Sequence, residues 1–81
     1  MPKEIPKEEI VKWLNKIKEI LPRIEANDTK GEEMYTNMKA YISDCEHFLN
    51  QEDYMRSFES IVWAWAIFEI CQELGVLSYE G

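Results

Sequence analysis

The sequence has little of the residues that interrupt helices, because its 81 residues include only three glycines and three prolines. It also contains no long polar linker and no internal repeat. A chain of this length makes one domain, which buries about 60–65% of the surface that its unfolded form exposes and leaves little room for an enclosed active site. We therefore expect a single helical domain over residues 1–81, without a deeply buried substrate pocket.

Basic residues are scarce as well, with nine lysines and arginines against sixteen acidic residues and a formal net charge of −7. This charge repels the phosphate backbone of nucleic acids, and no cluster of lysine and arginine offers a local exception. We expect no nucleic-acid partner, and the acidity is typical of a well-solvated surface.

A long hydrophobic run is missing too. The longest run, residues 61–68, contains eight apolar residues, whereas a transmembrane helix needs about 20. The first six residues, Met-Pro-Lys-Glu-Ile-Pro, lack the apolar core of a signal peptide. We therefore expect a cytoplasmic protein with no membrane-spanning segment.

Histidine and cysteine are too few for a metal or catalytic centre, with one histidine and two cysteines in the chain. Residues 44–47 read Asp-Cys-Glu-His, but successive helical positions point about 100° apart, so at most Asp44 and His47 share a face. Two ligands do not make a metal site, and no pair of nucleophile and histidine has a suitable geometry. The sequence predicts no metal, no cofactor and no catalytic residue.

What the sequence does contain is three amphipathic helical segments. In the first, about residues 7–26, apolar residues recur at spacings of four and three, and Trp13 lies at the edge of their stripe. The stripe consists of Ile10, Leu14, Ile17, Leu21 and Ile24. Pro6 suits the first turn of this helix, and Pro22 is expected to kink or fray its last turn near Ala26.

Two further helices are expected over about residues 29–50 and 54–74. The first of these begins either with a capping box that starts at Thr29 or behind Asp28, which is an alternative cap. Gly75 is placed to end the last helix in a left-handed turn. Because the breaks between the helices are short, the sequence predicts an all-α fold, an up-down-up three-helix bundle.

In this bundle Cys45 and Cys71 lie on adjacent antiparallel helices. They are about 13 residues out of register, or roughly 20 Å apart along the axis. A disulfide needs Cα atoms within about 7 Å, so we expect two free thiols.

The last helix carries more apolar surface than one stripe can hold, because residues 61–68 are apolar nearly all round. Its first stripe, which we assign to the core, consists of Tyr54, Phe58, Ile61, Trp65 and Phe68. Its second stripe, almost opposite the first, consists of Trp63, Ile67, Ile70 and Leu74. The second stripe has no partner in the chain except the tail over Val76–Tyr79. We therefore predict that a homodimer or another protein partner covers it.

Three polar residues, Tyr41, Asp44 and Glu69, are candidates for ligand binding in an inter-helix cleft. The predicted register places Glu69 near Met34, some 15 Å along the axis from Asp44, so the two carboxylates cannot share a proton. Glu69 lies among apolar neighbours and is expected to pair with a lysine of the first helix or with Tyr35. Tyr41 and Asp44 are expected to fix the register of the helices.

The second half of the chain carries a specific series of residues. The series consists of Tyr41, Asp44, Phe48, Leu49, Asp53-Tyr54, Phe58-Glu59, Trp63-Ala64-Trp65-Ala66, Glu69 and Leu74-Gly75-Val76-Leu77. It resembles an archaeal family known only as domain of unknown function 357, with mild departures at Cys45, Glu52, Ser57 and Glu69. The resemblance implies a small up-down-up three-helix bundle of undetermined biochemical role.

Two functional hypotheses follow from these features. The first is an interaction module that forms a homodimer, or docks a larger protein, through the second stripe of the last helix. The alternative is a small ligand-binding or enzymatic domain that uses Tyr41, Asp44 and Glu69 in an inter-helix cleft. The residues favour the first hypothesis, because no set of side chains demands catalysis.

Overall fold

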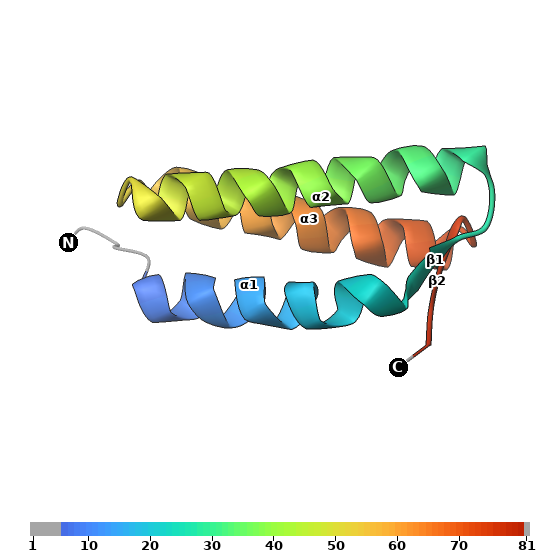
Figure 1. Cartoon of the computed structure of the whole chain (residues 1–81), viewed down its shortest axis with the longest axis horizontal. Helices are drawn as coiled ribbons and strands as arrows, with labels where there is room; N and C mark the ends of the chain where they lie inside the picture. The colour runs from blue at the N-terminus through green and yellow to red at the C-terminus, as the bar shows by residue number, and fades with distance from the viewer. Residues whose placement is uncertain (1–5, 81) are drawn as a thin grey trace.

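The computed structural model describes residues 6–80, and its three helices run up, down and up along one long axis (Figure 1). α1 spans Lys7–Ile20, α2 spans Thr29–Asn50 and α3 spans Tyr54–Glu73. The predicted all-α, up-down-up three-helix bundle is confirmed. Most of the segment on which the expectation about a signal peptide depends, residues 1–5, lies outside the described residues.

Side-chain caps begin both long helices. Asp28 is the N-cap of α2, because its carboxylate accepts a hydrogen bond of 2.8 Å from the backbone N–H of Gly31. Of the two caps that the sequence allows, the structure thus has Asp28 and not Thr29. Asp53 caps α3 in the same way and accepts from the backbone N–H of Arg56 at 3.3 Å. These caps satisfy N–H groups that have no partner inside a helix, and so they fix where α2 and α3 begin.

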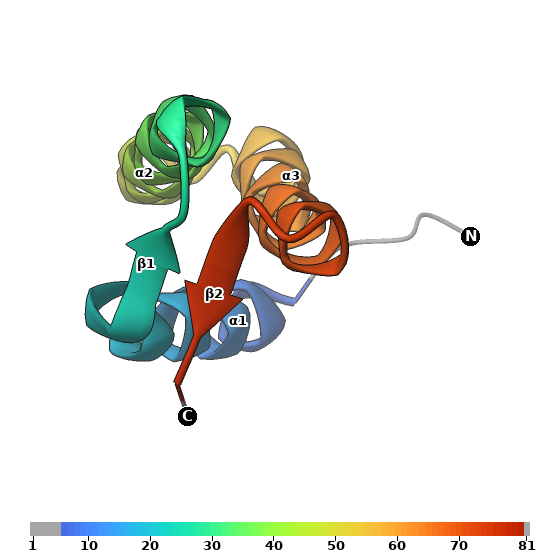
Figure 2. The same ribbon diagram turned by 90° about the vertical axis from the view of Figure 1, so that its right-hand side faces the viewer.

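The carboxyl end of α3 is a Schellman motif centred on Gly75. The φ angle of Gly75 is +83°, a left-handed conformation that glycine adopts without steric cost. The N–H of Gly75 donates to the carbonyl of Gln72 at 3.2 Å, and the N–H of Val76 donates to the carbonyl of Cys71 at 3.0 Å. The motif turns the chain off the helix axis and directs it towards α1 (Figure 2).

The prediction of a helix over residues 7–26 is wrong for its last six residues. α1 ends at Ile20, a single 3-10 turn follows over Leu21–Arg23, and the strand β1 occupies Ile24–Ala26. Pro22 lies in the 3-10 turn. Proline has no backbone N–H and its ring clashes with the carbonyl four residues earlier in an α-helix, so the chain leaves the helical path here.

The strand β1 pairs antiparallel with β2, which spans Leu77–Tyr79, and the two strands lie across one end of the bundle (Figure 2). Leu77 is almost fully buried. The side-chain Nδ2 of Asn27 donates to the carbonyl of Gly75 and to Oγ of Ser78, both at 2.8 Å. We name this strand pair the β clasp, because it ties the segment after α3 to the segment after α1.

Small side chains line the contact between α2 and α3. On α3 the buried line contains Ser57, Ala64 and Cys71, which recur at a spacing of seven residues. Oγ of Ser57 donates to the carbonyl of Cys45 on α2 at 2.8 Å, and the two side chains are also in contact at 3.3 Å. Small residues allow two helices to approach closely, and α2 and α3 form the closest helix pair of the bundle.

The core predicted for α3 is confirmed in part, because Ile61 and Phe68 are buried. Tyr54, Phe58 and Trp65, which the sequence assigns to the core, are only half-buried. The buried face of α3 also includes the small side chains of Ser57, Ala64 and Cys71, so it is turned partly away from these three large residues. α1 packs less closely on this pair than its two helices pack on each other. It contributes three buried side chains, Ile10, Leu14 and Ile17.

Candidate interaction surface

The second stripe predicted on the last helix lies on the surface of α3. The exposed fraction of the residue is 56% for Trp63, 56% for Ile70 and 72% for Leu74, whereas Ile67 is half-buried. The tail that could have covered Ile70 and Leu74 instead forms β2 and pairs with β1. We name these four residues the α3 stripe, and the described part of the tail leaves it open to solvent.

The position of the α3 stripe follows from the helical wheel. At about 100° per residue, the stripe lies roughly 90° around α3 from the buried line of Ser57, Ala64 and Cys71. It is therefore placed along the flank of α2, where the ring of Trp63 stacks on Tyr41 with centroids 6.2 Å apart and an angle of 18° between the planes. Tyr41 is half-buried, so the stacked pair extends the apolar surface from α3 onto α2.

The three polar candidates do not share one cleft. Tyr41 stacks on a ring of the α3 stripe, and Asp44 is exposed on α2. Glu69 is exposed rather than partly buried, and of the three residues it alone lines the groove between α1 and α3. The hydroxyl of Tyr35, a partner expected for Glu69, instead donates to the carbonyl of Leu21 at 3.2 Å.

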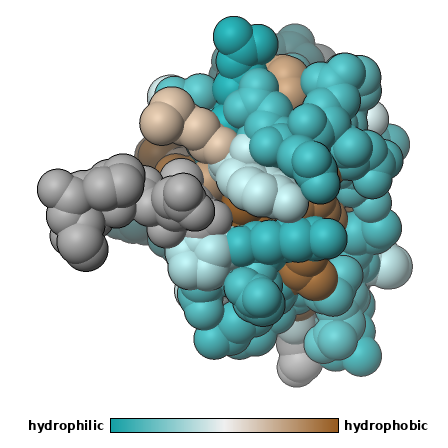
Figure 3. All heavy atoms as spheres, turned by 90° about the vertical axis from the view of Figure 1, so that its left-hand side faces the viewer, coloured by the Kyte–Doolittle hydropathy of each residue, from teal (hydrophilic) through white to brown (hydrophobic). Residues whose placement is uncertain are grey.

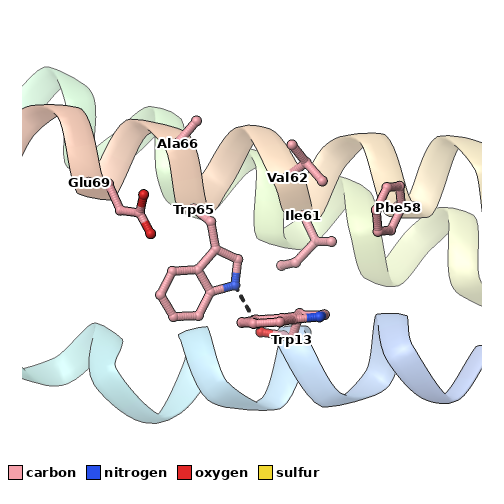
Figure 4. A pocket seen from close by; sticks show the side chains of 7 residues that line it. All are labelled: Trp13, Phe58, Ile61, Val62, Trp65, Ala66 and Glu69. Carbon is pink, nitrogen blue, oxygen red and sulfur yellow. Dashed lines mark hydrogen bonds between the residues drawn. The ribbon is translucent and has the colours of Figure 1, made fainter.

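The groove between α1 and α3 has a volume of about 450 Å³ (Figure 4). Trp13 forms its wall on α1. Its wall on α3 consists of Phe58, Ile61, Val62, Trp65, Ala66 and Glu69. Trp13 and Trp65 meet edge to face with ring centroids 5.9 Å apart, and Nε1 of Trp65 donates to the carbonyl of Trp13 at 3.2 Å. Hydrophobic periodicity predicts Trp65 in the core and not in the wall of a groove. The one sequence feature that indicates the groove is Trp13, a large side chain at the edge of the apolar stripe of its helix.

Both surfaces lie on the sides of α3, the groove from Phe58 to Glu69 and the stripe from Trp63 to Leu74. The end of the bundle at which α1 begins is by contrast mostly hydrophilic, with hydrophobic residues in smaller areas (Figure 3). Within the described part of the chain, no group of three or more histidine, cysteine or acidic side chains is placed to hold a metal ion. No described helix is long and apolar enough to cross a membrane.

The two thiols are free and buried. Burial raises the pKa of Cys45, the hydrogen bond with Ser57 opposes this shift, and the charge of Glu46 adds to it. Burial also raises the pKa of Cys71, against the opposing charge of Lys30. The thiolate is the form that attacks electrophiles and binds metals, so a raised pKa makes both cysteines unreactive.

Comparison with known proteins agrees with the fold. Residues 11–77 match a family described as protein of unknown function, DUF357. The chain belongs to the DUF357 family. A DUF357 protein from Archaeoglobus fulgidus, solved by crystallography, is 42% identical, with 91% of this chain and 92% of that chain covered and a TM-score of 0.83. Among curated proteins no match was found.

The DUF357 match extends beyond the second half of the chain, on which the resemblance rests. It begins at Val11 in α1 and ends at Leu77 in β2. It therefore includes the groove, the α3 stripe and most of the β clasp. The family supports the fold and an unassigned role, and the chemistry of the two surfaces has to be argued from the structure.

Proposed function

We propose that this DUF357 protein is a helical interaction module that forms a two-fold symmetric homodimer through the α3 stripe. The observation that carries the proposal is the exposure of Trp63, Ile70 and Leu74 on one helix, with β2 turned away from them. Single apolar side chains are ordinary on a surface, but a contiguous row with a tryptophan is typical of an interface.

Symmetry supports a second copy as the partner. A self-complementary patch closes under a two-fold axis and needs no other gene product. The stripe from Trp63 to Leu74 is about 16 Å long, so α3 could cross its own copy over three helical turns. The free, buried thiols fit a reducing compartment, and we extend the proposal to a cytoplasmic location.

The substitution Ile70→Glu tests the proposal. Ile70 is exposed in the single chain, so the monomer should tolerate a glutamate there. In the dimer each copy would bring one unpaired negative charge into the contact, which destabilises it. We expect wild-type protein to be a dimer by light scattering, and the variant to be a monomer with unchanged circular dichroism and an affinity weakened about 100-fold or more. Ile67 is less suitable because it is half-buried.

The matched control is Met55→Glu. Met55 is on the same helix and 71% exposed, but it is not part of the α3 stripe, so this variant should remain a dimer. Wild-type protein that is monomeric at the highest soluble concentration contradicts the proposal. A dimeric Ile70→Glu variant contradicts it equally, and an unfolded one shows that Ile70 belongs to the core.

A further inference from the structure

We propose that the groove between α1 and α3 binds a small organic cation, namely an ammonium group attached to an aromatic or aliphatic body. This activity is independent of the homodimer and uses another face of α3. The volume of about 450 Å³ lies within the range of small-molecule pockets, roughly 300–1,000 Å³. A three-turn helix about 10 Å across has a volume of roughly 1,300 Å³, so the groove is too small to enclose a partner helix.

The walls of the groove select an apolar body. Trp13 and Trp65 are nearly perpendicular, with an angle of 84° between their planes, and Phe58 lies at the far end of the α3 wall from Glu69 (Figure 4). Aromatic rings bury a large area at a small cost in side-chain entropy and accept other rings edge to face. A phenyl ring or short alkyl chain can therefore pack in the groove against the exposed faces of these three side chains.

The polar groups of the groove select a positive charge. Nε1 of Trp65 already donates to the carbonyl of Trp13, so this N–H is not available to an anion. The other indole nitrogen of the groove, Nε1 of Trp13, lies on the side of its ring away from Glu69 (Figure 4). Of the described residues that line the groove, Glu69 alone is charged, and its carboxylate is directed into the space beside Trp65 (Figure 4). An ionised carboxylate only accepts hydrogen bonds, and an ammonium group only donates them, so the two groups are complementary in charge and in hydrogen bonding.

Two lysines define where the ammonium group of the ligand binds. Nζ of Lys12 and Nζ of Lys16 lie 5.8 Å and 5.6 Å from the ring centroid of Trp13. This ring thus already attracts cations, as indole faces do. A further cation at Trp13 meets the charge of these lysines, whereas at Glu69 it meets a carboxylate. The ligand is therefore oriented with its ammonium group at Glu69 and its apolar body towards Trp13.

A titration with three matched probes tests this inference. Phenethylammonium, hydrocinnamate and phenethyl alcohol have nearly the same shape and carry a positive, a negative and no charge. We expect saturable shifts of the Trp13 and Trp65 indole signals in nitrogen-15 spectra, with a Kd on the order of millimolar for the ammonium probe. Hydrocinnamate should bind about tenfold more weakly, because it lacks the ion pair with Glu69 and the cation–aromatic contact with Trp65. Each of these exposed interactions contributes only a small part of the free energy of binding.

Two variants separate the role of Glu69 from the effect of the negative net charge of the protein. Glu69→Gln keeps the shape of the side chain and should remove the preference for the ammonium probe. Glu73→Gln removes a carboxylate on the same helix that does not line the groove, so the preference should remain. Equal affinity for the three probes, no binding of the ammonium probe, or shifts centred on Trp63 overturns the inference. The same titration in the Ile70→Glu variant gives the same result whether or not the protein is a dimer, so the two proposals fail separately.

Discussion

Single small residues set how closely the helices and the β clasp approach one another. A Cβ atom on Gly31, in the first turn of α2, would overlap the carbonyl oxygen of Val76 and lie 3.4 Å from Cα of Ala26. Hydrophobic periodicity gives most weight to large apolar residues, so it predicts Phe58 and Trp65 in the core. It gives no signal at a closely packed glycine such as Gly31. The close contacts depend on distances between segments far apart in the chain, which the pattern of one helix does not contain.

Gly31→Ala should therefore destabilise the protein. The added methyl group has to displace the backbone of Val76, and overpacking of this kind costs about 1–3 kcal/mol in the free energy of unfolding. Chemical denaturation measures this loss. Gly75→Ala is the comparison, because its Cβ meets no atom within 4 Å and its cost, about 1 kcal/mol, comes from the left-handed backbone alone. An unchanged midpoint for Gly31→Ala would show that Val76, just before β2, is not packed on α2.

The buried thiols make the stability depend on alkaline pH. The folded state raises the pKa of Cys45 and Cys71, so the unfolded chain loses these protons first as the pH rises. Their contribution to stability is complete below the ordinary thiol value of 9.0 and is lost as the pH rises from there through the folded pKa. We expect the free energy of unfolding of wild-type protein to fall more steeply above this value than that of Cys45→Ala. Parallel pH profiles would contradict the assignment.

The elements of the fold differ in how much local sequence determines them. Caps and periodicity are local, which is why the sequence predicts α2 and α3 to within a residue or two of the observed bounds. The strand β1 is not local, because its partner Leu77–Tyr79 lies at the other end of the chain. Leu21 and Ile24 have the spacing of a helix stripe, so Pro22 is the local residue that signals the break.

The most buried side chain of the β clasp is Leu77, of which 1% is exposed. Leu77→Ala removes most of a buried side chain and should lower the free energy of unfolding by about 2–4 kcal/mol. Met55→Ala removes an exposed side chain of α3 and should change it by less than about 0.5 kcal/mol. Thermal and chemical denaturation at one protein concentration compare the two. Equal losses of stability in Leu77→Ala and Met55→Ala would mean that the β clasp does not cover the end of the core.

At the scale of the molecule, the two candidate surfaces differ in how far the sequence reveals them. The α3 stripe is predictable, because residues 61–68 supply more apolar side chains than two neighbouring helices can cover. The groove is not, since it depends on how far α1 lies from α3 and on the contact between Trp13 and Trp65. Glu69 is a candidate in both descriptions. The sequence groups it with Tyr41 and Asp44 only in the cleft hypothesis, whereas in the structure it is exposed and lines the groove beside Trp65 (Figure 4).

The net charge of −7 predicts how salt changes the affinity of the proposed homodimer. A complex held together by ion pairs would respond to salt in the opposite direction. Glu59 lies four residues before Trp63, and Glu73 lies three residues after Ile70, so one acidic side chain precedes the α3 stripe and another lies beside its last turn. Two such chains repel each other, and salt screens this repulsion while leaving apolar contacts intact.

We therefore expect the dimer to tighten several-fold between about 0.05 M and about 0.5 M sodium chloride, as the Debye length falls below the separation of the flanking charges. Sedimentation equilibrium measures the dissociation constant across this range. Glu73→Gln removes one repelling charge from each chain, so its dimer should be tighter at low salt and depend less on salt. A complex held by opposite charges, including any with nucleic acid, weakens as salt is added. A dimer that dissociates with salt would show that ion pairs, and not the apolar side chains of the α3 stripe, hold the two copies together.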